Sequence, residues 1–356
     1  MSEWTSNTTL DEINRWLAPK KSVVVITHSK PDGDALGSTL AVARALNIAA
    51  GGSAAGFSGV ASRAEVWFTG PMPGWWRSIA QDTKTRIIDQ HNPPPASHDP
   101  DAVLVLDTGA WSQLADYRPW LDDQHARCIL IDHHLNGDGD VAHKRLVDTS
   151  AAAACEIVAG LCTRLLKVES PSKLPVEITE PLYLGLATDT GWFRHSNVSP
   201  SVYRLAADLV ETGVGHERLF ELVEQRERAG RLRLLARALN TLELHDDGRV
   251  AVLSLTQSDF EKAGAAPGES GGFLDLVKTV ESVRVAVLLT EVETAGDGVV
   301  TKISFRSKGG PDMIDVNKVS MALGGGGHAQ AAGARLVGTR IGEARTKVLE
   351  ALGVSA

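Results

Sequence analysis

The stretch VVVITHSKPDGDALG, residues 23–37, is the part of the chain from which the fold can be argued. Its apolar, β-branched beginning, residues 23–26, predicts a strand buried on both faces. His28, Asp32 and Asp34 follow directly, so side chains of the kind that bind metal ions stand where the strand ends. In an open parallel sheet, ligands bind outside the carboxyl ends of the strands. The stretch therefore predicts an α/β domain with a site at this end of its sheet.

Two further apolar runs release polar side chains in the same way. Residues 102–106 (AVLVL) are followed by Asp107, and residues 128–131 (CILI) are followed by the triplet Asp132, His133 and His134. Three buried parallel strands that end in such residues bring them to one edge of the sheet. Residues far apart in the sequence are therefore expected to form one site.

The chemistry of these side chains favours divalent cations. Carboxylate oxygens suit hard cations, and imidazole shifts the preference from Mg²⁺ toward Mn²⁺. Four Asp and two His therefore predict two divalent ions, with Mn²⁺ preferred and Mg²⁺ or Co²⁺ as alternatives. Two ions roughly 3.5 to 4 Å apart need a bridging carboxylate and supply a hydroxide that attacks phosphorus in line. Asp107 is the candidate bridge.

Five motifs occur in order along the chain, and together they resemble a known family. They are HSKPDGDALGS at 28–38, LDTG at 106–109, DHH at 132–134, ATDTG at 187–191 and GGGGHAQAAG at 324–333. The first four resemble the motifs of the DHH phosphoesterase superfamily, and the fifth resembles its usual C-terminal companion, the DHH-associated domain. Within the superfamily, the arrangement is similar to the bifunctional oligoribonuclease and 3′-phosphoadenosine 5′-phosphate phosphatase group, the nanoRNases.

The resemblance implies roles for the aspartates and histidines of the first four motifs. One metal would be held by His28, Asp32 and Asp107. The other would be held by Asp34, Asp107, His133 and Asp189. His134 would face the scissile phosphate or assist protonation of the leaving group, and Asp132 would orient a ligand. The implied catalytic residues are thus His134, Asp107 and Asp132.

The resemblance also implies that the C-terminal domain binds the nucleotide. Arg306 lies near the end of a strand-like segment, where its planar guanidinium can hold a phosphate with two hydrogen bonds. Consecutive glycines let backbone N–H groups approach an anion, and a helix N-terminus next to them would add a favourable dipole. We expect Arg306, Gly326, Gly327 and His328 to grip a phosphate.

The implied function is hydrolysis of very short oligoribonucleotides to mononucleotides, and of 3′-phosphoadenosine 5′-phosphate to AMP. The attacking group would be the hydroxide held by both metals. Alternatives inside the superfamily are a linear or cyclic dinucleotide phosphodiesterase and a pyrophosphatase. A non-catalytic nucleotide sensor is an alternative of another class, because binding and hydrolysis would use the same residues.

Each motif taken alone also has a structural interpretation. The Asp-x-Asp pair and the glycines are common in solvated turns, and adjacent histidines can be structural. Asp189 can cap a turn after residues 183–187, a segment that fits a helix end or a strand. The arginines of residues 226–237 fit either a solvated helix face or contacts to RNA phosphates.

The fold class predicted for the 356 residues is α/β with two domains. Residues 1–199 would form a parallel-sheet DHH domain with helices on both faces. Residues 200–245 would form a helical linker, and residues 246–356 a smaller mixed α/β domain that binds the substrate. Two regions depart from the family's pattern: residues 153–154, and the connection between the first and second motifs. Ala153 and Ala154 stand where relatives carry a helix-capping hydroxyl, and Trp67, Trp75 and Trp76 either pack in the core or stack on bases.

Composition narrows the partners and the location. A formal charge of −8 disfavours electrostatic coating of long nucleic acid, so short RNA oligonucleotides or small nucleotides are the expected substrates. The N-terminus resembles no secretory signal, and Thr9 with Glu12 predicts a capping box. No membrane span is predicted, and Cys128, Cys155 and Cys162 suit a reducing compartment. We expect a cytoplasmic protein, and the resemblance suggests a homodimer.

Overall fold

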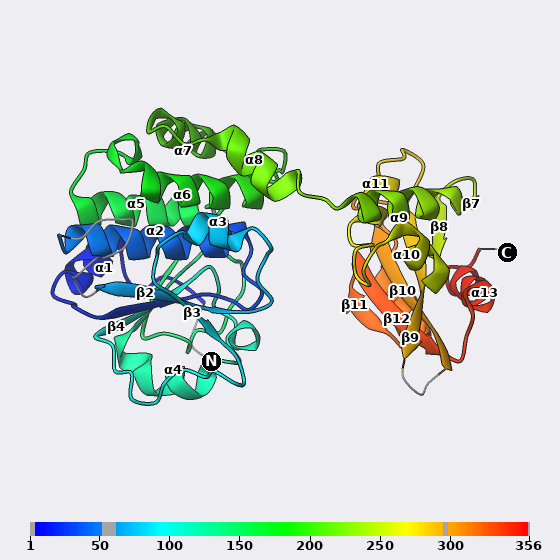
Figure 1. Cartoon of the computed structure of the whole chain (residues 1–356), viewed down its shortest axis with the longest axis horizontal. Coiled ribbons are helices and arrows are strands. Elements are labelled where there is room, and N and C mark those ends of the chain that lie inside the picture. Colours follow the sequence, from blue (N-terminus) through cyan, green and yellow to red (C-terminus); the bar gives the residue numbers. More distant parts are fainter. Residues whose placement is uncertain (1–3, 52–61, 295–297, 355–356) are drawn as a thin grey trace. The chain divides into compact units, whose positions relative to one another are not determined.

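A computed structural model describes residues 4–51, 62–294 and 298–354. The chain divides into two compact units, Met1–Gln225 and Arg226–Ala356 (Figure 1). The helical segment expected at 200–245 is shared between them. Helices α7 (Pro200–Glu211) and α8 (His216–Glu224) pack on α6 (Val176–Asp189) in the first unit, and α9 (Ala229–Asn240) packs on strand β8 and helix α10 in the second. Its amphipathic helices thus join the cores beside them instead of forming a separate linker.

The first unit is built on a six-stranded, wholly parallel sheet with the order β3-β2-β1-β4-β5-β6. The strands are β1 (Val23–Ile26), β2 (Ala64–Thr69), β3 (Thr85–Ile88), β4 (Ala102–Leu106), β5 (Cys128–Asp132) and β6 (Lys144–Val147). The strand order reverses between β1 and β4. In open parallel sheets, this switch point opens a crevice at the carboxyl ends of the strands.

Helices cover both faces of this sheet, as the sequence predicts. The remaining helices of the unit are α1 (Leu10–Leu17), α2 (Gly33–Ala49), α3 (Trp76–Ala80), α4 (Arg118–Gln124) and α5 (Ala154–Leu166). Helices α2, α5 and α6 pack on one face and α4 on the other, with α7 and α8 outside α6 (Figure 1). Alternate residues of one strand therefore serve two cores. Val23 and Val25 enter the first and Val24 and Ile26 the second, which confirms that β1 is buried on both faces.

Local details settle two of the open readings. Thr9 and Glu12 form the expected capping box at the start of α1. Trp67 is fully buried in the core beneath α4, and Trp75 and Trp76 are partly buried against the other core. The tryptophans therefore pack, and none of the three presents a free ring for base stacking.

The second unit contains a six-stranded mixed sheet with the order β11-β12-β10-β9-β8-β7, in which only β8 and β9 are parallel. Its strands are β7 (Glu243–His245), β8 (Val250–Leu255), β9 (Val285–Thr294), β10 (Gly298–Ser307), β11 (Gly326–His328) and β12 (Ala331–Val337). Its further helices are α10 (Gln257–Ala263), α11 (Phe273–Val277), α12 (Val316–Ala322) and α13 (Ile341–Ala351). This agrees with the predicted smaller mixed α/β layer.

Helices cover the two faces of this second sheet unequally. Helices α12 and α13 pack on one face, in a core that includes Ile303 and Phe305 of β10. On the other face, α9, α10 and α11 pack against β8 and β9, in a core that includes Leu253 and Leu288. That core takes no residue from β10, β12 or β11, so these three strands present an open face.

The prediction of a helix N-terminus beside the glycines is wrong. The glycine run follows the end of α12 at Ala322, and Gly326 to His328 form the edge strand β11. A tight turn then leads into β12, which pairs with both β11 and β10. Tertiary pairing of residues 331–337 with β10 prevents this segment from becoming a helix.

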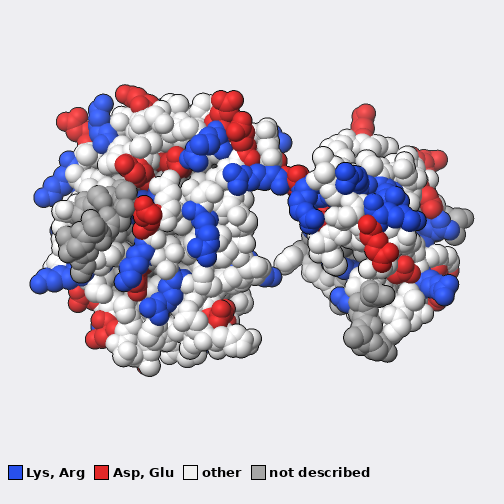
Figure 2. All heavy atoms as spheres, in the orientation of Figure 1, with Lys and Arg blue, Asp and Glu red and all other residues white. Residues whose placement is uncertain are grey.

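The arginines of residues 226–237 mostly bind carboxylates of their own unit. Arg228 pairs with Glu269 at 3.1 Å and Arg237 with Asp259 at 3.2 Å, while Arg231 lies 3.4 Å from Glu227. Figure 2 shows basic side chains gathered over α9 with acidic side chains close by. This pattern supports the solvated, ion-paired helix face.

Two findings concern the chain as a whole. Among the described residues, no helix is both long and apolar enough to cross a membrane. All three cysteines are buried and carry free thiols.

Candidate metal centre

The polar residues that follow β1, β4 and β5 meet at the carboxyl ends of these strands, beside the switch point. Three groups of potential ligands lie there, and the ligand atoms of each group are within 4.8 Å of one another. The groups are His28 with Asp32 and Asp107; Asp34 with His133 and Asp189; and Asp107 with Asp132, His133 and His134. All of the first four motifs therefore converge in the first unit.

Asp107 lies at the centre of the cluster. Its Oδ2 is 3.5 Å from Nε2 of His28, and its Oδ1 is 3.4 Å from Nε2 of His133. The backbone of Asp107 is left-handed, with φ of 61°, directly after β4 ends. Non-glycine residues rarely adopt this conformation, and Asp is among those that tolerate it best. The two oxygens of one buried carboxylate thus face the two imidazoles, as a bridging ligand requires.

A second group forms where α2, α5 and α6 come close together. Nε2 of His133 lies 3.3 Å from Oδ2 of Asp189 and 3.8 Å from Oδ2 of Asp34. Asp189 is the last residue of α6, which decides between the helix and strand readings of that segment. Gly185 permits the close approach, because a Cβ there would lie 2.3 Å from Sγ of Cys155 and 2.8 Å from Oδ1 of Asp34.

Asp34 also caps α5 from outside that helix. Its Oδ2 accepts the N–H of Ala154 at 2.6 Å, and its Oδ1 accepts the N–H of Cys155 at 2.9 Å. The N-cap residue Ala153 makes no side-chain hydrogen bond. A fully buried carboxylate therefore satisfies the helix terminus that lacks a capping hydroxyl, and the same contacts hold Asp34 in place.

Asp132 and His134 form a pair at the mouth of the cluster. Oδ1 of Asp132 accepts from the backbone N–H of His133 and lies 2.7 Å from Nδ1 of His134. The side chain of Asp132 is fully buried, whereas that of His134 is 53% exposed. Because Nδ1 is engaged, Nε2 of His134 is the ring nitrogen free to meet a substrate.

Burial and mutual proximity shift the pKa values of the carboxyl groups. Burial raises the pKa of Asp34 well above its usual range, and Asp107 and Asp189 add to the effect. Burial, with nearby Asp107, raises the pKa of Asp189 to about 7. Burial acts upward on Asp107 as well, but the nearby imidazoles of His133 and His28 leave its pKa lowered. Asp107 is thus held in the charged form.

The imidazoles respond to the same carboxylates. Burial alone would lower the pKa of His28, but hydrogen bonds to Asp107 and Asp32 raise it to about 11. Burial is likewise outweighed at His133, where Asp107 and then Asp34 raise the pKa to about 9. The hydrogen bond to Asp132 raises the pKa of His134. Protons therefore supply the positive charge that this acidic cluster requires in the absence of another cation.

Unpaired buried atoms provide a test of whether the residues fit divalent cations. Asp107 Oδ1, Asp132 Oδ2 and His133 Nε2 are buried and have no hydrogen-bond partner within the described residues. Leaving such atoms unsatisfied is costly, and a missing ion is one of the few explanations. Carboxylate oxygens and imidazole nitrogens are also the ligands that Mn²⁺ and similar ions prefer. The residues fit a pair of divalent cations.

Three residues near the cluster escaped the sequence analysis. Gln113 and Asn136 help to line a pocket of about 300 Å³ that His28, Asp107 and His134 also line. Asn136 follows the DHH triplet closely, which was a usable signal. Trp4 donates from Nε1 to the carbonyl oxygen of His134 at 3.0 Å, a contact between residues 130 positions apart that no local pattern announces.

Trp4 also covers the two loops that carry the cluster. A Cβ added to Gly109 or to Gly137 would come within 1.8 and 2.5 Å of its ring, respectively. These glycines lie just after Asp107 and His134. The indole therefore holds the two loops side by side.

The expected phosphate grip lies in the second unit, on the open sheet face. Arg306 of β10, Ala331 of β12 and His328 of β11 are register partners, so they form one row across three strands. Gly326 pairs with Gly333 in the next row on the same face. Gly327 has a φ of 151°, and a Cβ there would lie 2.5 Å from the carbonyl oxygen of Ala331. The structure thus brings Arg306 and His328 together on one surface.

Comparison with known proteins places the chain in a family. Residues 22–186 match the DHH family, N-terminal domain, and residues 247–353 match the DHHA1 domain. A protein of Thermus thermophilus named bifunctional oligoribonuclease and PAP phosphatase NrnA is 34% identical, covering 93% of this chain and 89% of the relative. The chain therefore belongs to the DHH family, in its two-domain form with DHHA1.

Other relatives agree with this membership. A Bacillus subtilis protein with the same name is 26% identical, over 66% of this chain and 69% of its own length. A cyclic-di-AMP phosphodiesterase, GdpP, of Bacillus subtilis is 23% identical, but only 47% of its length is covered. An exopolyphosphatase-related protein of Bacteroides fragilis has the same fold, with a TM-score of 0.79, 22% identity and coverage of 99% of this chain and 98% of that one.

Proposed function

We propose that the protein is a two-metal phosphoesterase that hydrolyses very short oligoribonucleotides to mononucleotides and 3′-phosphoadenosine 5′-phosphate to AMP. Membership of the DHH family and 34% identity to a relative named for both activities support this function. The observation that carries it is the buried carboxylate of Asp107, whose two oxygens face His28 and His133. A shared carboxylate is what a pair of cations requires.

In this proposal, His28, Asp32 and Asp107 hold one cation. Asp34, Asp107, His133 and Asp189 hold the other. When bound, the two cations, with Mn²⁺ preferred, would activate water and neutralise charge on the phosphate. The chain's own part is to fix the ligands before substrate arrives. Burial, the left-handed turn at Asp107 and the contacts of Asp34 to α5 serve this purpose.

His134 is the proposed proton donor to the leaving oxygen. Asp132 fixes its Nδ1, so Nε2 can face the scissile phosphate from the half-exposed side of the cluster. Asp132 is itself held by the backbone N–H groups of His133 and His134. It is therefore a positioning residue, and its negative charge favours the protonated imidazole.

Arg306, Gly326, Gly327 and His328 are the proposed phosphate grip of the substrate. No carboxylate within the described residues pairs with Arg306, whose one recorded side-chain hydrogen bond goes to the backbone carbonyl oxygen of Phe305. Its guanidinium is therefore free to donate hydrogen bonds to a phosphate. In this division of labour, the first unit performs the chemistry and the second selects nucleotides.

Two further attributes belong to the proposal. Three free, buried thiols suit a reducing cytoplasm. A homodimer remains the suggested assembly. Purified protein analysed by light scattering would test the second attribute directly.

The decisive experiment uses a substrate panel with metal-stripped protein reloaded with Mn²⁺. The panel consists of an RNA dinucleotide, a five-residue RNA, 3′-phosphoadenosine 5′-phosphate, a cyclic dinucleotide and pyrophosphate, with the products of each resolved. Mononucleotides from both RNAs and AMP from the bisphosphate are the expected products. Turnover of the cyclic dinucleotide or pyrophosphate alone would replace the proposal by one of these alternatives. Binding without any turnover would identify a sensor.

A further inference from the structure

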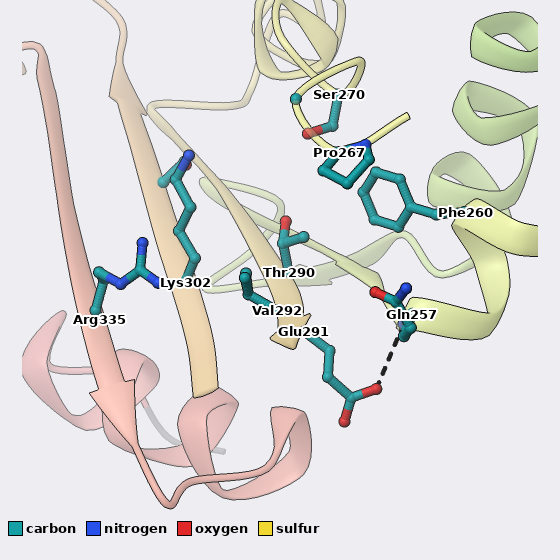
Figure 3. A pocket seen from close by; sticks show the side chains of 11 residues that line it. Gln257, Phe260, Pro267, Ser270, Thr290, Glu291, Val292, Lys302 and Arg335 are labelled. Carbon is teal, nitrogen blue, oxygen red and sulfur yellow. Dashed lines mark hydrogen bonds between the residues drawn. The ribbon is translucent and has the colours of Figure 1, made fainter. Parts of the chain in front are cut away.

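The second unit contains a pocket beside the phosphate grip that the proposed function leaves unused. Its volume is about 440 Å³, within the roughly 300–1,000 Å³ common for ligand sites. Strands β9, β10 and β12 form one side, and α10 with the loop after it forms the other. Figure 3 shows Lys302 and Arg335 on neighbouring strands at one side of the pocket, and Phe260 and Pro267 at the other.

Two cations stand directly opposite each other at this pocket. Lys302 of β10 and Arg335 of β12 are register partners, and both side chains are exposed. Neither side chain has a hydrogen-bond or ion-pair partner anywhere in the described ranges. Like charges placed directly across antiparallel strands destabilise a sheet. A bound anion would remove that penalty, so the pair favours a ligand with negative charge.

A carboxylate at the same pocket does not neutralise this pair. Glu291 lines the same pocket, but its side chain accepts from the backbone N–H of Gln257 at 3.4 Å. No ion pair within 4.0 Å joins Glu291 to Lys302 or Arg335 among the described residues. The cations therefore remain available to a phosphate.

A second hollow extends the pocket along the open face toward the glycines that precede β11. This hollow of about 340 Å³ shares Lys302, Ser304 and Arg335 with the first and extends to Gly324 and Gly325. Between the Lys302 row and the Arg306 row lies a row of small residues, in which Ser304 pairs with Gly333 and Gly333 with Gly326. Small side chains leave room for a chain to lie along this face.

The spacing of the rows leaves room for two phosphates. Lys302 and Arg306 are four residues apart on one strand and point to the same face. Four residues of antiparallel strand span about 14 Å. At this backbone separation each row can serve a different phosphate of an extended ligand.

The far wall of the pocket has the character that a nucleobase needs. Phe260 and Pro267 provide apolar surface, and Gln257 and Ser270 provide hydrogen-bonding groups. Bases bind on apolar and aromatic surfaces with little dependence on sequence. Two cations facing an apolar wall therefore suit a nucleotide better than inorganic phosphate or a lipid.

We propose that Lys302, Arg335 and the Phe260 wall form a second nucleotide subsite. It would bind a neighbouring phosphate and base of an oligonucleotide whose other phosphate lies at Arg306 and His328. This inference rests on the proposed function and deepens it. The subsite would favour RNA of several residues over 3′-phosphoadenosine 5′-phosphate, which has no second nucleotide to place there.

The test compares the full-length wild-type protein with the double variant Lys302→Gln/Arg335→Gln. Binding of a labelled five-residue RNA is measured with metal-stripped protein, and kcat and KM for this RNA and for 3′-phosphoadenosine 5′-phosphate are measured with Mn²⁺. The double variant should raise the Kd and KM for the RNA about 10-fold. It should lower the salt slope of RNA binding by about 1. The KM for the bisphosphate should change less than about 3-fold, since that ligand has no second nucleotide to occupy the subsite.

Two further variants separate the subsite from general effects. Lys318→Ala/Lys347→Ala removes the same charge from helices on the opposite sheet face and should behave as wild type. Lys302→Arg/Arg335→Lys keeps both cations and should restore RNA binding. Equal losses on the RNA and the bisphosphate, or losses matched by the control, would overturn the subsite.

The subsite and the proposed function fail in different ways. If wild-type protein hydrolyses the RNA and the double variant binds and hydrolyses it equally well, the subsite is wrong and the function stands. If wild-type protein binds the RNA without hydrolysing it, while the double variant loses binding, the function is wrong and the subsite stands.

Discussion

In the first unit the charged residues of the site lie largely inside the protein, whereas in the second they stand on an open sheet face. Asp34, Asp107 and Asp132 are buried almost completely, while Lys302 and Arg335 are exposed. The first arrangement fixes ligand positions before any cation binds. The second leaves the charged groups of Lys302 and Arg335 free to meet ligands of different length. In the proposed function, the buried arrangement suits the holding of metal ions and the accessible surface suits the binding of nucleotides.

The largest expected effect comes from the residue at the centre of the buried cluster. Asp107→Asn should lower kcat by at least about 10⁴-fold, the upper end of what one positioned acid–base group contributes, because both cations lose a shared ligand. Metal content, measured by plasma mass spectrometry, should fall with activity. Asp116→Asn changes an exposed carboxylate of the same unit and serves as control. Full activity and full metal content in Asp107→Asn would refute the two-metal site.

The pair at the mouth of the cluster should show a smaller effect. His134→Ala should lower kcat by about 10² to 10⁴-fold, as loss of a general acid does, while metal content is retained. Asp132→Asn should cost about 10 to 100-fold, because it only positions the imidazole. A substrate with a better leaving group should recover much of the His134→Ala loss. Equal loss on both substrates would contradict proton donation.

Proton release provides a test that needs no substrate. With pKa values of about 11 at His28 and about 9 at His133, both imidazoles are protonated in metal-free protein at pH 7. Cations must displace these protons, so metal affinity should rise as pH rises from 6 to 9. Calorimetry in two buffers of different ionisation enthalpy should show release of more than one proton. Binding heats independent of the buffer would contradict these pKa shifts.

A substitution on the open face should produce the smallest change, and this change should affect substrate binding alone. His328→Ala should raise KM about 10-fold, because one charge-assisted contact to phosphate is lost. Both kcat and metal content should stay within about twofold. His125→Ala, an exposed histidine of the first unit, is the matched control. Loss of metal from His328→Ala would break the division of labour between the units.

Much of the catalytic unit could be predicted from the sequence because its signals are local. Apolar runs that end in Asp or His identify strands and their carboxyl ends together, and β1, β4 and β5 appear where these runs stand. The capping box at Thr9 is local as well. The helix N-terminus expected next to the glycines is not found there, because the segment that follows them pairs with β10 as strand β12.

Other features depend on contacts between distant residues, which local patterns do not encode. Asp34 caps a helix 120 positions away, and Trp4 holds the loops at Gly109 and Gly137. No periodicity or spacing announces either contact, since both follow from how α2, α5 and the N-terminal segment pack.

The sequence by itself determined the parallel-sheet domain, the inventory of cation ligands and the family to which the chain belongs. The tertiary structure decided which oxygen of Asp107 faces which imidazole and which residues share a row across β10, β12 and β11. The physical reason is that strand formation and residue chemistry follow from neighbouring residues. Register and ligand geometry instead arise only when segments far apart in the chain pair and pack.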